Sequence, residues 1–261
     1  MSLVRKAALA LALPVVLVVT WWLVSAGSVD FYRPPLSTIL TAFADTWTWD
    51  RIRADVLPSL GRLAVGYALA FVCGVGLGVL IGSFRDVRAF LEPLLEFLRA
   101  IPPPVLVPVF ILVAGLGDRT KVLVIAFGCV WPILLNTVEG VRGRDEVLSD
   151  TCRSYGIDGG LRLWHLVLRS ASPRIVTGAR QALAIAIIVM VISEMIAANN
   201  GLGFTVLQFQ RGFEIPAMWS GVLLLGLIGV ALAWGFRLVE ARVLGWYYGQ
   251  RAGQRSGRRE W

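Results

Sequence analysis

Six apolar stretches alternate with polar segments along this chain, and a long basic segment separates the fourth stretch from the fifth. About 20 apolar residues suffice for a helix to cross the hydrocarbon core of a bilayer. The pattern therefore predicts an all-α polytopic integral membrane protein that forms a single domain over residues 1–261. The predicted spans cover residues 7–26, 62–84, 101–115, 121–138, 175–198 and 219–238, and the basic loop covers residues 141–174.

The first stretch fits two interpretations. Arg5 and Lys6 before it are typical of the basic start of a signal peptide, whose apolar region is usually about 7–15 residues long. This stretch is longer and contains Trp21 and Trp22, which suit the aromatic belt at a membrane interface. We therefore favour a retained helix over a cleaved signal.

Small residues recur at every fourth position of the second span. In a helix this spacing places them on one face, where the backbone of a neighbouring helix can approach closely. We expect this face to pack against another span, although glycine is common in membrane helices in general. The residues are Gly66, Ala70, Gly74, Gly78 and Gly82.

Prolines interrupt the third span, at positions 102, 103, 104 and 108. Because proline lacks the amide hydrogen and fixes its own backbone angle, this span is predicted to be kinked or broken. Irregular backbone at membrane depth is tolerated only where protein or water covers it. We therefore expect the segment inside the bundle, near a pathway.

Composition and charge agree with a membrane location. Hydrophobic residues make up 57% of the chain and the mean hydropathy is +0.72, which is more apolar surface than one soluble core hides. The formal charge of +8 could suit nucleic acid, but the basic residues lie between the spans, as the positive-inside rule explains. If both termini are cytoplasmic, eighteen of the 25 arginines and lysines fall inside and seven outside, Arg62 and Lys121 among the seven.

Residues with catalytic or metal-binding chemistry are few. The three cysteines, Cys73, Cys129 and Cys152, have no metal-ligand spacing, and His165 is the lone histidine. His165 could act as a pH switch, but an ordinary surface histidine is the simpler interpretation. A membrane-embedded enzyme would need clustered nucleophiles, bases or metal ligands. The chain is therefore expected to be no enzyme and to hold no cofactor or metal of its own.

The basic loop predicts two short helices, at residues 146–154 and 161–168. Gly156 follows the first of them and can adopt the positive backbone angle that ends a helix. Asp150 and Arg153 stand three residues apart on one helical face, where they can form an ion pair. A helical loop of this length is unusual without a binding role. The alternative is a solvated charged face.

The loop sequence resembles the cytoplasmic loop of permease subunits in binding-protein-dependent ABC importers. That family's pattern is Glu-Ala-Ala, three residues, Gly, nine residues, then Ile-x-Leu-Pro. In this chain Asp150-Thr151-Cys152 stands in the place of Glu-Ala-Ala, Gly156 is in register, and Leu166-Val167-Leu168-Arg169 stands in the place of Ile-x-Leu-Pro. The chain departs from the pattern at Asp for Glu, at Thr-Cys for Ala-Ala and at Arg for the last Pro.

Further stretches are similar to the nitrate, sulfonate and taurine branch of this family, so that the resemblance runs from about Pro34 to Glu240. These stretches are residues 34–40, 91–102, 131–137 and 193–203. The resemblance implies the type I ABC importer permease fold, with six transmembrane helices and cytoplasmic coupling helices. It also implies a multi-pass protein of a bacterial plasma (inner) membrane, with both termini in the cytoplasm.

Partners follow from the resemblance as well. It implies a second permease subunit, often an identical copy, two cytoplasmic ATP-binding subunits on the two loops, and an extracytoplasmic solute-binding protein. No Gly-x-x-x-x-Gly-Lys-Ser/Thr segment occurs in the sequence, so ATP and Mg²⁺ are expected on the partner ATPase. The residues implied in coupling to the ATPase are Asp150, Thr151, Cys152, Arg153, Gly156, Arg162, His165 and Leu168.

Only the resemblance to this branch indicates which solute is transported. An organic sulfonate or a taurine-like anion is the first expectation, and nitrate, a vitamin precursor or an aromatic acid are alternatives. A passive channel or a membrane scaffold is a more distant alternative, which would need no ATPase.

Polar residues within the spans are candidates for the translocation pathway, because they are costly in lipid and usually face a cavity or a partner. Glu194 lies thirteen residues past Gln181, about 20 Å along a helix. A bare carboxylate would repel an anionic solute. We therefore expect Glu194 to act at an outer gate or to bond a neighbouring helix terminus. The pathway candidates are Asn136, Gln181, Ser193 and Glu194.

Overall fold

The computed structural model describes residues 3–247 and 249, with side chains from Ala12 onward. All regular structure in these residues is helical. The elements are α1 (Leu3–Ser25), α2 (Leu36–Thr46), α3 (Trp49–Arg51), η1 (Ile52–Val56), α4 (Leu57–Ser83), α5 (Arg85–Ala100), η2 (Pro103–Leu106), α6 (Val107–Ala114), α7 (Asp118–Arg142), α8 (Glu146–Ser154), α9 (Gly159–Arg162), η3 (Leu163–Leu168), α10 (Arg169–Ala197), α11 (Leu202–Arg211) and α12 (Ile215–Val243).

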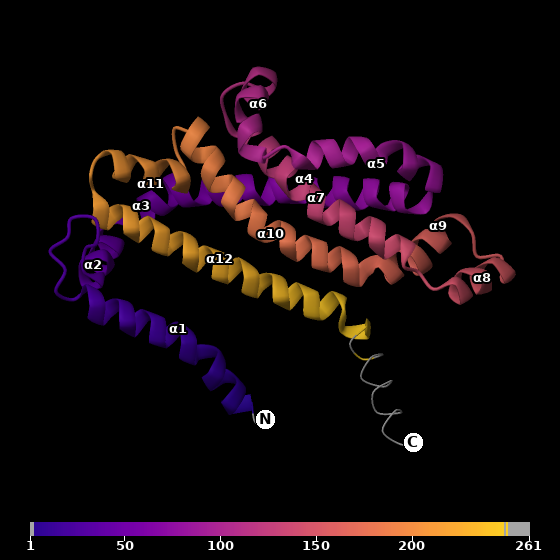
Figure 1. The fold of residues 1–261 in the computed structure, drawn as a ribbon, viewed down its shortest axis with the longest axis horizontal. Helices are drawn as coiled ribbons and strands as arrows, with labels where there is room; N and C mark the ends of the chain where they lie inside the picture. Colours follow the sequence, from indigo (N-terminus) through magenta and orange to yellow (C-terminus); the bar gives the residue numbers. More distant parts are fainter. Residues whose placement is uncertain (1–2, 248, 250–261) are drawn as a thin grey trace.

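The part of the chain that the structure describes has four long apolar helical stretches, and they run along the long axis of the molecule (Figure 1). Two of them are continuous through wider helical turns: α3, η1 and α4 form Trp49–Ser83, and α9, η3 and α10 form Gly159–Ala197. With α7 and α12, these stretches are long and apolar enough to cross a membrane. The helices α8 and α9 lie at one end, which we call the hairpin end, and α2, α3 and α11 lie at the opposite end (Figure 1).

The third predicted span is broken, as its prolines indicated. Ile101 is extended (φ −78°, ψ 119°) because it precedes a proline, and the segment Pro103–Ala114 continues at 88° to α5. The segment Pro103–Ala114 is too short to cross a bilayer alone. The predicted span 101–115 is therefore too short, and a crossing in this region must include α5. Counting that bent pair, the described residues hold up to five candidate spans, and α1 is a further apolar helix. The count of six spans stays a prediction.

The small-residue face of α4 lies against α7. A Cβ atom added to Gly66 would lie 2.8 Å from Ile125, and one added to Gly78 would lie 2.5 Å from Thr137. Such distances leave no room for a side chain, so the two backbones approach as closely as glycine permits. Gly74 and Gly82 meet α7 in the same way, and Ala70 is 1% exposed.

The core lies between α4, α7 and α10, where Ile125, Ile133 and Met190 are fully buried. The last long helix is attached differently. Its buried residues all lie in its first two turns, where Trp47 Nε1 of the α2–α3 connection donates to Ser220 Oγ at 3.1 Å. Beyond Gly221, no described residue of α12 is fully buried, although Leu232 and Phe236 pack in part against the core.

Candidate functional site

The α8–α9 hairpin turns at a capped glycine. Before α8, a side-chain oxygen of Asp145 accepts a hydrogen bond from a first-turn amide at 2.8 Å, which satisfies one of the free donors of the helix start. After α8, Gly156 has a φ of 64°, and the Ile157 amide donates to the Cys152 carbonyl at 2.8 Å. This is the Schellman arrangement, which favours glycine because a Cβ atom is strained at positive φ.

The hairpin exposes charged and apolar side chains together. Arg162 Nη2 donates to Ser149 Oγ at 2.9 Å and so joins α9 to α8. Asp150 and Arg153 form the ion pair that their spacing indicated, at 3.8 Å. A surface of this mixed kind is typical of a protein–protein contact. Its exposed large apolar side chains are Val147, Leu148, Tyr155, Leu161, Leu163 and Trp164.

The second arm of the hairpin is continuous with the bundle. The helix runs from α9 through η3 into α10 without a break. Leu166 and Val167 are buried, and Val167 packs in a cluster with Val141 of α7 and Ala171 of α10. The second arm of the hairpin and α10 therefore form one continuous helix that packs against α7.

The remaining loop candidates differ in exposure. Thr151 Oγ1 donates to the Val147 carbonyl at 2.7 Å, which is a bond within the exposed helix. His165 is exposed, with Nδ1 3.2 Å from the Leu161 carbonyl. Leu168 is half-buried and packs against the cluster that holds Val167. Of these three side chains, Thr151 and His165 are open to a partner.

Asn136 of α7 and Gln181 of α10 meet across the helix pair. Asn136 Nδ2 donates to Gln181 Oε1 at 3.3 Å and to the Pro132 carbonyl at 2.8 Å. The helices cross closely here, since a Cβ atom on Gly178 would lie 2.5 Å from that carbonyl. Because Gln181 is exposed in the described chain, this polar pair borders a surface and not the core.

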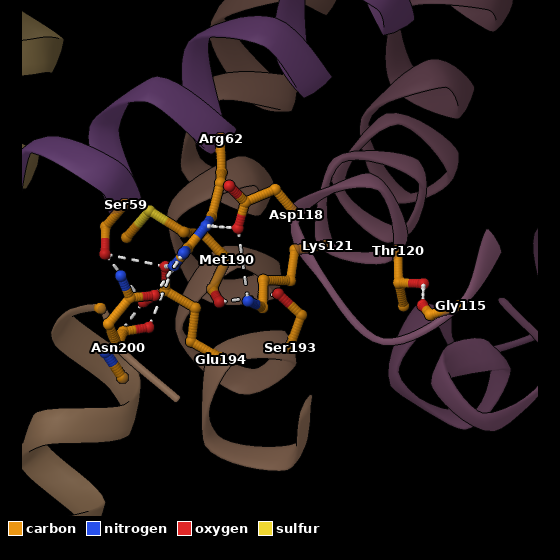
Figure 2. Close-up of polar contacts among 12 residues, drawn as sticks. Ser59, Arg62, Gly115, Asp118, Thr120, Lys121, Met190, Ser193, Glu194 and Asn200 are labelled. Carbon is orange, nitrogen blue, oxygen red and sulfur yellow. Dashed lines mark hydrogen bonds and ion pairs between the residues drawn. The ribbon is translucent and has the colours of Figure 1, made fainter. Parts of the chain in front are cut away.

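Ser193 and Glu194 lie further along α10, and neither reaches a surface. Ser193 is 1% exposed, and its hydroxyl donates to the Met190 carbonyl at 2.8 Å. Glu194 is 0% exposed and forms an ion pair with Arg62 of α4, with 2.7 Å between Oε1 and Nη1. Figure 2 shows the group around this pair. We call it the Arg62–Glu194 cluster, and it comprises Ser59, Arg62, Asp118, Lys121, Glu194 and Asn200.

Arg62 is the centre of the cluster. Its guanidinium donates to Glu194, to Asp118 Oδ1 at 2.8 Å and to Asn200 Oδ1 at 2.5 Å, although the side chain is only 4% exposed. Lys121 Nζ lies 3.5 Å from the same Asp118 oxygen. Two cations thus face two carboxylates. Pairing and hydrogen bonding are the conditions under which charges are tolerated away from water.

Glu194 also holds the connection between α10 and α11. Its carboxylate accepts hydrogen bonds from the Ser59 hydroxyl at 2.8 Å and from the Gly203 amide, in the first turn of α11, at 3.0 Å. Asp55 accepts from the Gly201 amide at 3.1 Å. Gly201 has a φ of 117°, and a Cβ atom there would lie 2.6 Å from the Glu194 carboxylate. Core carboxylates therefore satisfy free amides at the start of α11, where negative charge is favourable.

The sequence pointed to Glu194 but not to its partners. Arg62 and Lys121, which the charge count assigns to the outer segments, are not solvent-exposed loop charges, because they are 4% and 3% exposed on α4 and α7. Arg62 and Lys121 each stand at the start of a predicted span. Both starts lie at the end of the bundle where α10 finishes, and Glu194 is near that end of α10. Comparing the positions of Arg62, Lys121 and Glu194 along their predicted spans would have shown that all three lie near the same end of the bundle. Among the described residues, no group of three or more histidines, cysteines or carboxylates could hold a metal ion.

Residues 74–245 match the family described as "Binding-protein-dependent transport system inner membrane component". The match covers more than half of the chain, and the chain belongs to this family. It is thus a permease subunit of an ABC importer for small solutes, a membrane protein and not itself an enzyme.

Two relatives place the chain in the branch that its sequence resembled. The taurine transport system permease protein TauC of Escherichia coli (strain K12) is 28% identical, over 93% of this chain and 91% of the relative. The putative aliphatic sulfonates transport permease protein SsuC of Bacillus subtilis (strain 168) is 27% identical, over 90% and 86%. The prediction of the nitrate, sulfonate and taurine branch is confirmed.

A solved structure shares the fold. A chain of the MetNI methionine ABC transporter, in inward-facing conformations, superposes with a TM-score of 0.67 at 18% identity, over 75% of this chain and 97% of that chain. The similarity confirms the type I importer permease fold.

Proposed function

We propose that two copies of this chain form the transmembrane pathway of an ATP-driven importer for an organic sulfonate. The names of the two relatives support the solute class, since taurine and aliphatic sulfonates share the sulfonate group. A separate solute-binding protein delivers the sulfonate at the end where α11 lies. Two ATP-binding subunits dock at the hairpin end, in the cytoplasm, on the same side as the chain termini.

The observation that carries the coupling role is the rigid path from the hairpin to the core. The exposed arm that carries Trp164 is joined to α10 by an unbroken helix, and the bond from Arg162 to Ser149 ties α8 to that arm, so a partner that moves the hairpin moves α10. ATP closes the ATPase dimer and thereby favours one arrangement of the bundle over the other. Packed helices shift as units in such transitions.

A substitution at Gly156 tests this coupling. Gly156→Leu is expected to abolish the stimulation of the ATPase by the binding protein, and uptake with it, because a branched side chain is strained at a φ of 64°. No atom lies within 4 Å of the added Cβ, so packing is not disturbed and membrane insertion stays normal. The measurement is ATP hydrolysis and solute uptake by the complete complex in proteoliposomes.

The matched control is Gly156→Asn, because asparagine tolerates the left-handed backbone better than other side-chain-bearing residues. This variant is expected to keep most of the stimulation. Wild-type coupling in Gly156→Leu would overturn the role of the capped turn. The solute is tested separately, by uptake of labelled taurine and its inhibition by ethanesulfonate. ATPase stimulation without any sulfonate uptake would refute the solute class and leave the permease role intact.

A further inference from the structure

A groove of about 390 Å³ lies between α10 and α12, and the coupling role does not use it. It is lined mainly by apolar side chains, among them Leu183, Ile187 and Ile188 of α10 and Phe236 of α12. Gly229 of α12 lines it without a side chain, and a Cβ atom added there would lie 3.8 Å from Ile187 Cδ1, so a longer side chain would extend into the groove.

Two arginines stand at one end of this groove. Helix α10 starts at the hairpin end and α12 ends there, so Arg180 and Arg237 both lie at the hairpin side of the apolar lining (Figure 1). Arg180 forms an ion pair with Glu240, whereas Arg237 is exposed. Two positive charges against one carboxylate leave the mouth of the groove positive.

The depth of the arginines matches a lipid headgroup. Both lie near the hairpin-side limits of their predicted spans, residues 175–198 and 219–238. Trp234, one turn before Arg237, is 65% exposed, and exposed tryptophans gather at membrane–water interfaces. Arginines at this level place their charge among headgroups while their stems stay on apolar surface.

We propose that this groove binds one anionic phospholipid of the leaflet on the hairpin side. An acyl chain lies along Leu183, Ile187 and Phe236, and the phosphate contacts Arg237, with Arg180 adding positive charge while it stays paired with Glu240. Basic pockets between membrane helices select anionic lipids by this combination of charge and apolar surface. A zwitterionic lipid offers the same chain but no net charge.

Native mass spectrometry of the purified full-length chain with phosphatidylglycerol and phosphatidylcholine tests the proposal. Wild-type protein is expected to retain one phosphatidylglycerol in preference to phosphatidylcholine. Arg237→Gln is expected to lower the occupancy about fivefold, the effect of one interfacial arginine. Gly229→Leu fills the groove and is expected to abolish retention.

Matched controls separate the groove from general effects on α12. Gly235→Leu adds the same side chain to the same helix where nothing lies within 4 Å, and Arg242→Gln removes an exposed arginine that does not line the groove. Both are expected to retain lipid as wild type does. Equal retention of the two lipids, or wild-type retention by Gly229→Leu, would overturn the proposal. A disulfide between two copies of Gly229→Cys in membranes would overturn it too, because a second copy would then fill the groove.

Discussion

At the scale of single residues, the Arg62–Glu194 pair is a buried ion pair whose loss should destabilise the fold. Removing one member of a buried ion pair leaves the other charge without compensation and costs about 3–5 kcal/mol. Arg62→Gln is therefore expected to lower the free energy of unfolding by about that amount, since Glu194 stays buried at 0% exposure. Thermal or denaturant unfolding of the purified chain in detergent measures the loss.

The control for this change is Arg119→Gln, which removes an exposed arginine next to Asp118. An exposed charge of this kind is expected to change stability by less than about 0.5 kcal/mol. If the two variants unfold alike, the Arg62–Glu194 cluster does not stabilise the fold.

The sequence alone indicates only part of the Arg62–Glu194 cluster. Glu194 stood out because a carboxylate within an apolar stretch needs a partner, and one of the two roles expected for it, a bond to a helix terminus, is the one that the Gly203 amide provides. Arg62 and Lys121 did not stand out, because a charge at the edge of a span resembles an ordinary loop charge. Only the packing of three helices shows which way such a side chain turns.

At the scale of elements, the close contact between α4 and α7 depends on glycines, which have no side chain. Gly78→Val places a Cβ atom 2.5 Å from Thr137 and 3.0 Å from the Leu134 carbonyl, and a backbone carbonyl cannot turn aside. Overpacking of this kind costs about 1–3 kcal/mol, so we expect the unfolding midpoint to fall accordingly. Unfolding of the purified variant in detergent is the measurement.

Gly76→Val is the matched control, because it makes the same change on the same helix where nothing lies within 4 Å of the added Cβ. It is expected to unfold close to wild type. Equal destabilisation by both variants would show that helix propensity, and not the close approach of α7, governs the effect.

Elements set by local signals were the easiest to predict. The bounds of α8, Glu146–Ser154, match the prediction because Asp145 and Gly156 mark them chemically. Helix α5 was not assigned, since Pro93 and six charged residues obscure its apolar positions. Those positions, Leu91 and Leu95 among them, pack against Ile81 and Leu134, a contact that no local signal encodes.

At the scale of the whole molecule, much of the apolar surface is not covered by other parts of the described chain. Beyond Gly221, no described residue of α12 is fully buried, and lipid or a second copy must cover its exposed side. The chain alone therefore specifies a core of α4, α7 and α10 but not the assembled pathway.

The polar pair Asn136–Gln181 gives the last prediction, because Gln181 is exposed near the hairpin-side end of α10, where a pathway between two copies could open. If Gln181 hydrogen-bonds the passing anion, Gln181→Leu removes a bond worth about 1.5 kcal/mol, and uptake by the complete complex should fall about tenfold. ATPase stimulation should persist, since the hairpin is untouched. Gln181→Asn keeps the amide and is expected to retain most uptake. Normal uptake by Gln181→Leu would show that the Asn136–Gln181 pair only joins the two helices and does not contact the solute.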